Sequence, residues 1–207
     1  MDALKNLASV LGRQDEGPNL ALADAIAKSE DEDAVGELII NLQNASKAIQ
    51  RDCIKVLYEV GGRNAALIAP HAADFLALLD NKDYGMVRGA MTALNAIASE
   101  KTNFLVSNLA VISAAANWGS VITRDWGVKI LFKLAAVKEH GAKAFPLLMD
   151  QLASCPANQL PMYAEVALSL REKGQKTALA KVLANRLDGI DKDSNCKRIE
   201  KVLAKLN

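Results

Sequence analysis

Residues 83–100, DYGMVRGAMTALNAIASE, decide the fold of this chain. Their apolar side chains recur at positions i, i+3, i+4 and i+7, which is the spacing of one face of an α-helix. Asp83 stands where a helix N-cap is expected. The stretch therefore predicts a helix over 83–99 that buries one side. The residues on that side are Val87, Ala90, Met91, Leu94, Ile97 and Ala98.

The same face recurs along the chain at a nearly fixed interval. Arg51, Arg88 and Arg124 are separated by 37 and 36 residues, and apolar rows on two successive helices keep the same register. One helix pair of this length cannot bury its apolar face alone, whereas stacked pairs can. The sequence thus predicts an array of helix pairs. Its rows are Cys53, Ala90, Trp126 and Ala164; Leu57, Leu94, Ile130 and Leu168; Ala72, Leu109 and Phe145; Phe75, Ile112 and Leu148; and Leu79, Ala116 and Leu152.

Composition agrees with an all-α protein. Of the 207 residues, 51% are hydrophobic but only 4% are aromatic, so Ala, Leu, Ile and Val supply most of the apolar surface. Ala and Leu are strong helix formers. The net charge is +1, with acids concentrated near the N-terminus and bases near the C-terminus. A chain so close to neutral lacks the positive field that dominates DNA affinity, so a nucleic-acid partner is not expected.

Capping and breaking residues divide the chain into repeats. Ser46, Asp83, Thr102 and Ser120 are predicted N-caps, while Gly61-Gly62 and His140-Gly141 are predicted to end helices. A single repeat domain is expected over 1–207. It comprises an N-terminal capping helix (2–12) and loop within 1–17, a short repeat at 18–43, helix pairs 46–60 with 64–80, 83–99 with 102–117, 120–137 with 141–154 and 158–172 with 175–187, and a C-terminal capping helix at 193–206.

The three cysteines, Cys53, Cys155 and Cys196, are far apart and show no metal-ligand spacing. A reducing, cytoplasmic location is therefore expected, with no metal and no cofactor. The N-terminal residues carry an acid at position 2 and no extended apolar run, unlike a secretory signal. No stretch approaches the roughly 18 apolar residues of a membrane span.

The run LLDNKDYGMVRGAMTALNAIA at 78–98 resembles a HEAT repeat in its polar turn, Val-Arg pair and Ala-rich first helix. The resemblance implies a right-handed α-α superhelix, a HEAT- or armadillo-like solenoid of about five helix pairs with capping helices at its ends. It also implies that the second helix of each pair lines a concave face. The chain departs from the pattern at Gln50, Thr123 and Met162, so an arginine ladder is expected only in the middle repeats.

No catalytic motif stands out, and the predicted function is a non-catalytic scaffold or adaptor that binds a protein or peptide. Fold class supplies this expectation. The candidate partner surface comprises polar residues displaced from the core rows of the second helices, namely His71, Asp74, Asn108 and Gln151. A regulatory subunit or assembly chaperone of an enzyme is a further alternative.

An enzymatic alternative comes from HEAT-like alkylpurine DNA glycosylases, which hold duplex DNA with aromatic, acidic and basic side chains. Trp118, Arg124, Asp125 and Trp126 are the residues that would serve. However, Gly119-Ser120 follows Trp118 where that family places an acid, and Trp126 falls on a core row.

The three arginines Arg51, Arg88 and Arg124 are predicted to bond to turn carbonyls and acids such as Asp83. A cationic stripe for an acidic partner is the alternative.

Overall fold

The chain is described by a computed structural model that covers residues 2–170 and 172–206, without the side chain of Lys173. The described residues form α-helices, short 3-10 helices (η) and turns, with no strand among them. They cluster into two compact units, Met1–Gly127 and Val128–Asn207, with the division inside helix α9. None of the described helices combines the length and apolarity needed to cross a bilayer.

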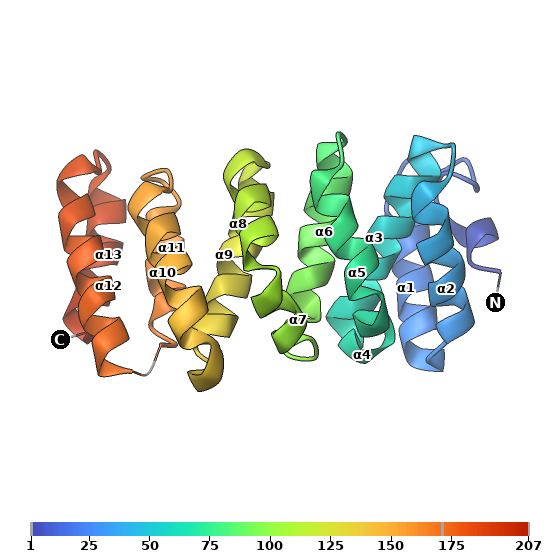
Figure 1. Cartoon of the computed structure of the whole chain (residues 1–207). Coiled ribbons are helices and arrows are strands. Elements are labelled where there is room, and N and C mark those ends of the chain that lie inside the picture. Colours follow the sequence, from blue (N-terminus) through green and yellow to red (C-terminus); the bar gives the residue numbers. More distant parts are fainter. Residues whose placement is uncertain (1, 171, 207) are drawn as a thin grey trace. The chain divides into compact units, whose positions relative to one another are not determined.

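The first unit begins with a single 3-10 turn and continues as helix pairs (Figure 1). α3 lies between α1 and α6 and packs against both. The elements of this unit are η1 (Leu4–Asn6), α1 (Gly17–Ser29), α2 (Glu32–Ile40), η2 (Asn41–Gln43), α3 (Lys47–Arg63), α4 (Ala65–Ile68), η3 (Ala69–His71), α5 (Ala72–Ala77), η4 (Leu78–Asp80), α6 (Tyr84–Ala96), α7 (Thr102–Ser107), α8 (Leu109–Trp118) and the start of α9 (Val121–Ala135).

The second unit holds the rest of α9 and the later helices. α12 packs against α10 and α13, and α13 also packs against α11. Arg198 of α13 forms a two-pronged ion pair with Glu165 of α11, at 2.7 and 2.8 Å. The elements are α10 (Lys138–Ser154), α11 (Leu160–Ala167), α12 (Lys173–Arg186), η5 (Leu187–Gly189) and α13 (Asp193–Leu206).

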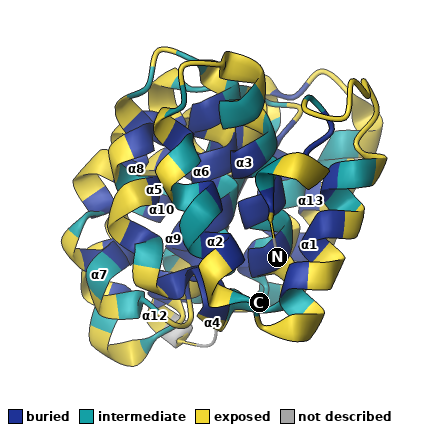
Figure 2. Ribbon diagram, turned by 90° about the vertical axis from the view of Figure 1, so that its right-hand side faces the viewer, coloured by how far each residue is buried: buried dark blue, intermediate teal, exposed yellow. Residues whose placement is uncertain are grey.

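The predicted core rows are confirmed almost throughout. Within each helix, buried positions alternate with exposed ones at helical spacing, as one-sided packing requires (Figure 2). Leu57, Leu94 and Ile130 are fully buried, as are Phe75, Ile112 and Leu148 on the second helices. Three bulky members of the rows are only half-buried, and these are Trp126, Phe145 and Leu168.

Several helix ends are as predicted because a side chain caps them. Ser46 accepts a hydrogen bond from the amide of Ile49 at 3.5 Å, and Asp83 accepts one from that of Gly85 at 2.8 Å. Ser120 accepts one from the amide of Thr123 at 3.2 Å. The prediction of Thr102 as a cap is wrong. Thr102 is the first residue of α7, and its hydroxyl donates back to the carbonyls of Ala98 and Ser99.

Other boundary predictions are also corrected. The predicted helix 2–12 is reduced to η1 and turns. Gly61-Gly62 does not end α3, which continues to Arg63. Gly61 has a packing role instead, because it is buried where a Cβ would meet the side chain of Ile68. His140-Gly141 lies in the first turn of α10 instead of ending a helix.

The predicted second helices 64–80 and 102–117 are broken. Pro70 has no amide hydrogen to donate and lies in η3, between α4 and α5. Asn108 separates α7 from α8, and its side-chain amide donates to the carbonyl of Phe104 at 2.8 Å. Of the predicted helix 158–172, residues 160–167 form α11, and residue 171 lies outside the described part.

Leu94 provides a test of the array. It is fully buried in the last turn of α6, so Leu94→Ala should lower the free energy of unfolding by about 2–5 kcal/mol. Amide hydrogen exchange should accelerate in α3 and α5 as well as α6, since neighbouring units in an array support one another. Val111→Ala is the control, because Val111 is 44% exposed and its truncation should change stability by less than about 0.5 kcal/mol. Faster exchange confined to α6 would contradict the coupling.

The three cysteines should differ in reactivity. Burial, and after it the charge of Asp52, raises the pKa of the Cys53 thiol to about 12. Cys155 is also buried, whereas Cys196 is half-buried. Because the thiolate is the reactive form, iodoacetamide at about pH 8 should modify Cys196 first in the native protein. Peptide mass spectrometry would measure this, with the denatured chain as the control. Equal rates at Cys53 and Cys196 in the native state would contradict it.

Candidate functional site

The candidate site is built where α3 and α6 approach closely. At Gly89 of α6, a Cβ atom would stand 2.6 Å from Cγ1 of Ile54 on α3, so only glycine fits this contact. Ile54 is 2% exposed. The side chain of Ile54 therefore packs directly on the backbone of α6 at Gly89. The residues on either side of this contact face a common pocket.

Residues 8–19 form a second wall of that pocket, and Asp52 of α3 holds this segment in place. One carboxylate oxygen of Asp52 accepts from the amide of Ser9 at 2.7 Å, and the other accepts from the side-chain amide of Asn19 at 2.7 Å. Asn19 is 2% exposed, and its carbonyl oxygen accepts from the amide of Ala8 at 2.9 Å. A short segment with little helix is thus fixed by three buried or half-buried hydrogen bonds.

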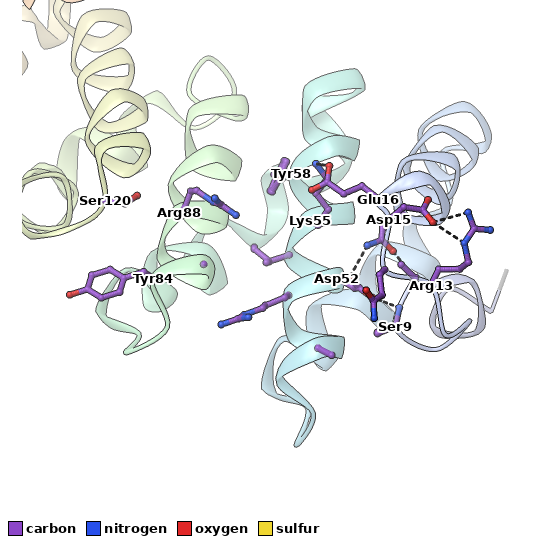
Figure 3. A pocket seen from close by; sticks show the side chains of 17 residues that line it. Ser9, Arg13, Asp15, Glu16, Asp52, Lys55, Tyr58, Tyr84, Arg88 and Ser120 are labelled. Atoms are coloured by element: carbon purple, nitrogen blue, oxygen red, sulfur yellow. Dashed lines mark hydrogen bonds and ion pairs between the residues drawn. The ribbon is translucent and has the colours of Figure 1, made fainter. Parts of the chain in front are cut away.

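The pocket has a volume of about 560 Å³ and is open to solvent (Figure 3). Three parts of the first unit line it, together with the single residue Ser120. The parts are residues 8–19, the face of α3 from Ala48 to Tyr58, and the first turn of α6 from Tyr84 to Arg88.

Most charges around the pocket are held in ion pairs. Arg13 bonds to Asp15 at 2.7 Å, and the ammonium group of Lys55 lies 2.9 Å from Glu16 and 3.1 Å from Glu59. Burial lowers the pKa of Lys55, but its contacts with Tyr58, Glu16 and Glu59 more than offset this and hold the pKa above its ordinary value. Lys55 thus remains a cation.

The three repeat arginines have different partners. Arg51 forms an ion pair with Asp83, the N-cap of the next repeat, at 2.8 Å. Burial raises the pKa of Asp83, but the amide of Gly85 and the guanidinium of Arg51 lower it further, so the net shift is downward. Arg124 instead donates to the carbonyls of Ala116 and Asn117 at the end of α8. The predicted bonding to acids and turn carbonyls is confirmed for these two arginines.

Arg88 is different. It is exposed, and within the described part of the chain its guanidinium forms no ion pair or hydrogen bond. Figure 3 shows its side chain extending from α6 into the pocket, toward α3. Arg88 is therefore a cation available to a ligand in this pocket.

An exposed aromatic pair borders the pocket. The rings of Tyr84 and Trp118 lie with their centroids 5.9 Å apart, tilted by 57°, a favourable geometry for two aromatic rings. Tyr84 is 60% exposed and Trp118 45% exposed. The pair also lines a second hollow of about 390 Å³ beside residues 80–82, so Tyr84 belongs to both pockets.

The partner surface predicted from the sequence is not this pocket, since none of its four residues lines it. His71 is half-buried, with Nδ1 3.5 Å from a carboxylate oxygen of Asp74, and Asn108 is half-buried at the break between α7 and α8. The prediction that Gln151 faces an open surface is wrong. It is only 3% exposed because its side chain packs inside the second unit, so it does not belong to a partner surface.

The four glycosylase-type residues have separate partners. Trp118 contacts Tyr84 with the two rings tilted, and the guanidinium of Arg124 donates hydrogen bonds to carbonyls at the end of α8. Asp125 and Trp126 are half-buried and both engage other groups. Among the described residues, no group of three or more His, Cys, Asp and Glu side chains could hold a metal ion.

Sequence reasoning missed Tyr84 and the wall formed by residues 8–19. A signal for the free arginine was present. Ser120 occupies the repeat position of Asp83, so the acid that pairs with Arg51 has no counterpart for Arg88. The bonds of Asp52 to the N-terminal segment join residues distant in the sequence, and helical periodicity does not report such contacts.

No protein-family model and no curated protein matches the chain. Its structure is similar to a designed armadillo repeat protein in complex with the peptide (KR)4, with a TM-score of 0.65 and 16% identity over 99% of this chain and 98% of that one. An engineered protein matches with a TM-score of 0.62 and 17% identity over 100% and 97%. The archaeal HEAT-like repeats protein from Thermococcus onnurineus NA1 matches with a TM-score of 0.50 and 12% identity over 93% and 97%.

The TM-scores establish likeness of fold, and the matches extend over nearly the whole of each chain. They agree with the HEAT-like character of residues 78–98. The chain is therefore an all-α protein with the armadillo- and HEAT-like solenoid fold.

Proposed function

We propose that this protein is a non-catalytic binding module that takes up an extended segment of a partner protein on the face formed by α3 and α6. The observation that carries this proposal is the exposed Tyr84–Trp118 pair, which lines the second pocket and, through Tyr84, also lines the first. Aromatic side chains are enriched at binding interfaces and contribute a large share of their energy. The pair offers a firm apolar contact beside a polar pocket.

Two ionised groups favour binding over acid-base chemistry: Lys55, which lines the pocket, and Asp83, which pairs with the pocket residue Arg51. A catalytic lysine or carboxylate needs a pKa shifted toward neutrality. The pKa of Lys55 is shifted upward, away from neutrality, and that of Asp83 is shifted downward, again away from it. Both groups keep fixed charges, which suits orientation of a ligand.

The similar designed armadillo repeat protein was solved with a bound peptide, and peptide binding by this chain is the corresponding inference. The partner's identity is left to experiment. A regulatory subunit or an assembly chaperone would use a surface of the same kind. The cytoplasmic location expected from the cysteines stays a prediction.

The aromatic pair can be tested directly. A library of random twelve-residue peptides would be selected on the native protein, and the affinity of selected peptides measured by fluorescence polarisation. Tyr84→Ser and Trp118→Ser should each weaken binding by about tenfold or more, because each removes a central aromatic contact. Ile40→Ser is the matched control, since Ile40 is 75% exposed on α2 and lines neither pocket.

Two results would contradict this proposal. The first is binding of selected peptides that both serine variants retain but that changes at Asp74 or Asn108 abolish. The partner surface would then be the one expected from the sequence. The second is a selection that yields no binding peptide, which would overturn peptide binding itself.

A further inference from the structure

The row of arginines contains one position at which an acid is missing. Arg51 of α3 pairs with Asp83, the N-cap of the first helix in the following repeat. One repeat later the corresponding residues are Arg88 and Ser120. Ser120 still caps its helix, but it carries no charge, and its hydroxyl lies 2.9 Å from that of Thr123. The counter-charge present in one repeat is therefore absent in the next.

We propose that a partner segment supplies this acid, and that Arg88 binds the carboxylate of a glutamate or aspartate side chain in it. This inference rests on the proposed function and names its ligand class as an acidic, apolar peptide. Arg88 lines the pocket and extends into it (Figure 3). A guanidinium presents planar paired donors that match a carboxylate.

The surroundings of Arg88 favour a carboxylate over a phosphate. The other cations that line the pocket, Arg13, Arg51 and Lys55, already have carboxylate partners. One available guanidinium balances the single charge of a carboxylate. A phosphate group carries more charge, and nucleic-acid binding depends on several cations that neutralise successive phosphates. A carboxylate therefore fits this pocket better than a phosphate group or a nucleic acid does.

The aromatic pair defines the rest of the ligand. Tyr84 lies one helical turn before Arg88 on α6, and in Figure 3 its ring points to the opposite side of the helix from Arg88. A segment that crosses the first turn of α6 would place its acid on Arg88 and an apolar side chain on Tyr84 and Trp118. Successive side chains of an extended peptide point to opposite sides. A peptide that alternates acidic and apolar residues can therefore meet these contacts in more than one register.

The test uses three labelled eight-residue peptides with blocked ends, namely (EL)4, (QL)4 and (KR)4. Blocked ends ensure that only side chains supply carboxylates. The wild-type protein should bind (EL)4 about tenfold or more tightly than (QL)4, as a hydrogen bond to a charged group requires. This preference should shrink at about 1 M salt, because Arg88 is exposed.

Two variants should abolish the preference for (EL)4. Arg88→Gln removes the cation. Ser120→Asp supplies within the chain the acid that the ligand would bring, by analogy with the Arg51–Asp83 pair, and aspartate remains a good N-cap. Lys28→Gln is the matched control. Lys28 is an exposed cation in the last turn of α1, outside the pocket, so this variant should bind all three peptides as the wild type does.

The outcomes separate this inference from the proposed function. Equal binding of (EL)4 and (QL)4 that still depends on Tyr84 and Trp118 would overturn the role of Arg88 and leave peptide binding in place. Preference for (KR)4, or a preference for (EL)4 that both variants retain, would also overturn the role of Arg88. No binding of any of the three, together with failure of the peptide selection, would overturn both.

Discussion

The contact between Gly89 and Ile54 is the constraint on which the first unit depends. A side chain at position 89 would meet the branched side chain of Ile54, so the absence of a Cβ allows α3 and α6 to pack closely. This packing positions the residues on both helices that face the pocket. It also brings Arg51 of α3 to the N-terminus of α6, where Asp83 both caps the helix and pairs with the arginine. Packing, capping and charge pairing thus occur at one junction.

Guanidinium groups satisfy helix ends elsewhere in the chain as well. Arg124 donates to two carbonyls at the end of α8, and in the second unit Arg186 donates to those of Leu152, Ala153 and Cys155 at the end of α10. The last carbonyls of a helix have no partner within it, and a cation is favoured there by the helix dipole. Arginine in this fold therefore has a structural use at two helix ends. Arg88, with no such task among the described residues, stands apart for that reason.

The sequence predicts the helical core well because burial follows a simple period. Leu57, Leu94 and Ile130 repeat at a nearly constant interval and are fully buried. Breaks within helices were harder to predict. Gly61-Gly62 lies within α3 because tertiary packing overrides the low helix propensity of glycine, whereas Asn108 interrupts a segment whose apolar period continues across it.

The candidate site could be predicted only in part. The arginine row was visible in the sequence, and so was the change from Asp83 to Ser120. The tilted contact between Tyr84 and Trp118 depends on how α6 and the end of α8 are placed, which the repeat period alone does not specify. The burial of Gln151 likewise depends on its neighbours, because a polar residue displaced from a core row can still face another helix.

The bonds of Asp52 to the N-terminal segment have a consequence for how the pocket forms during synthesis. Ser9 and Asn19 are synthesised before Asp52, whose carboxylate bonds to both. The wall that they build therefore cannot close until α3 has emerged and folded against α1. The N-terminal segment is translated first, yet it takes its final position only after the helix that anchors it.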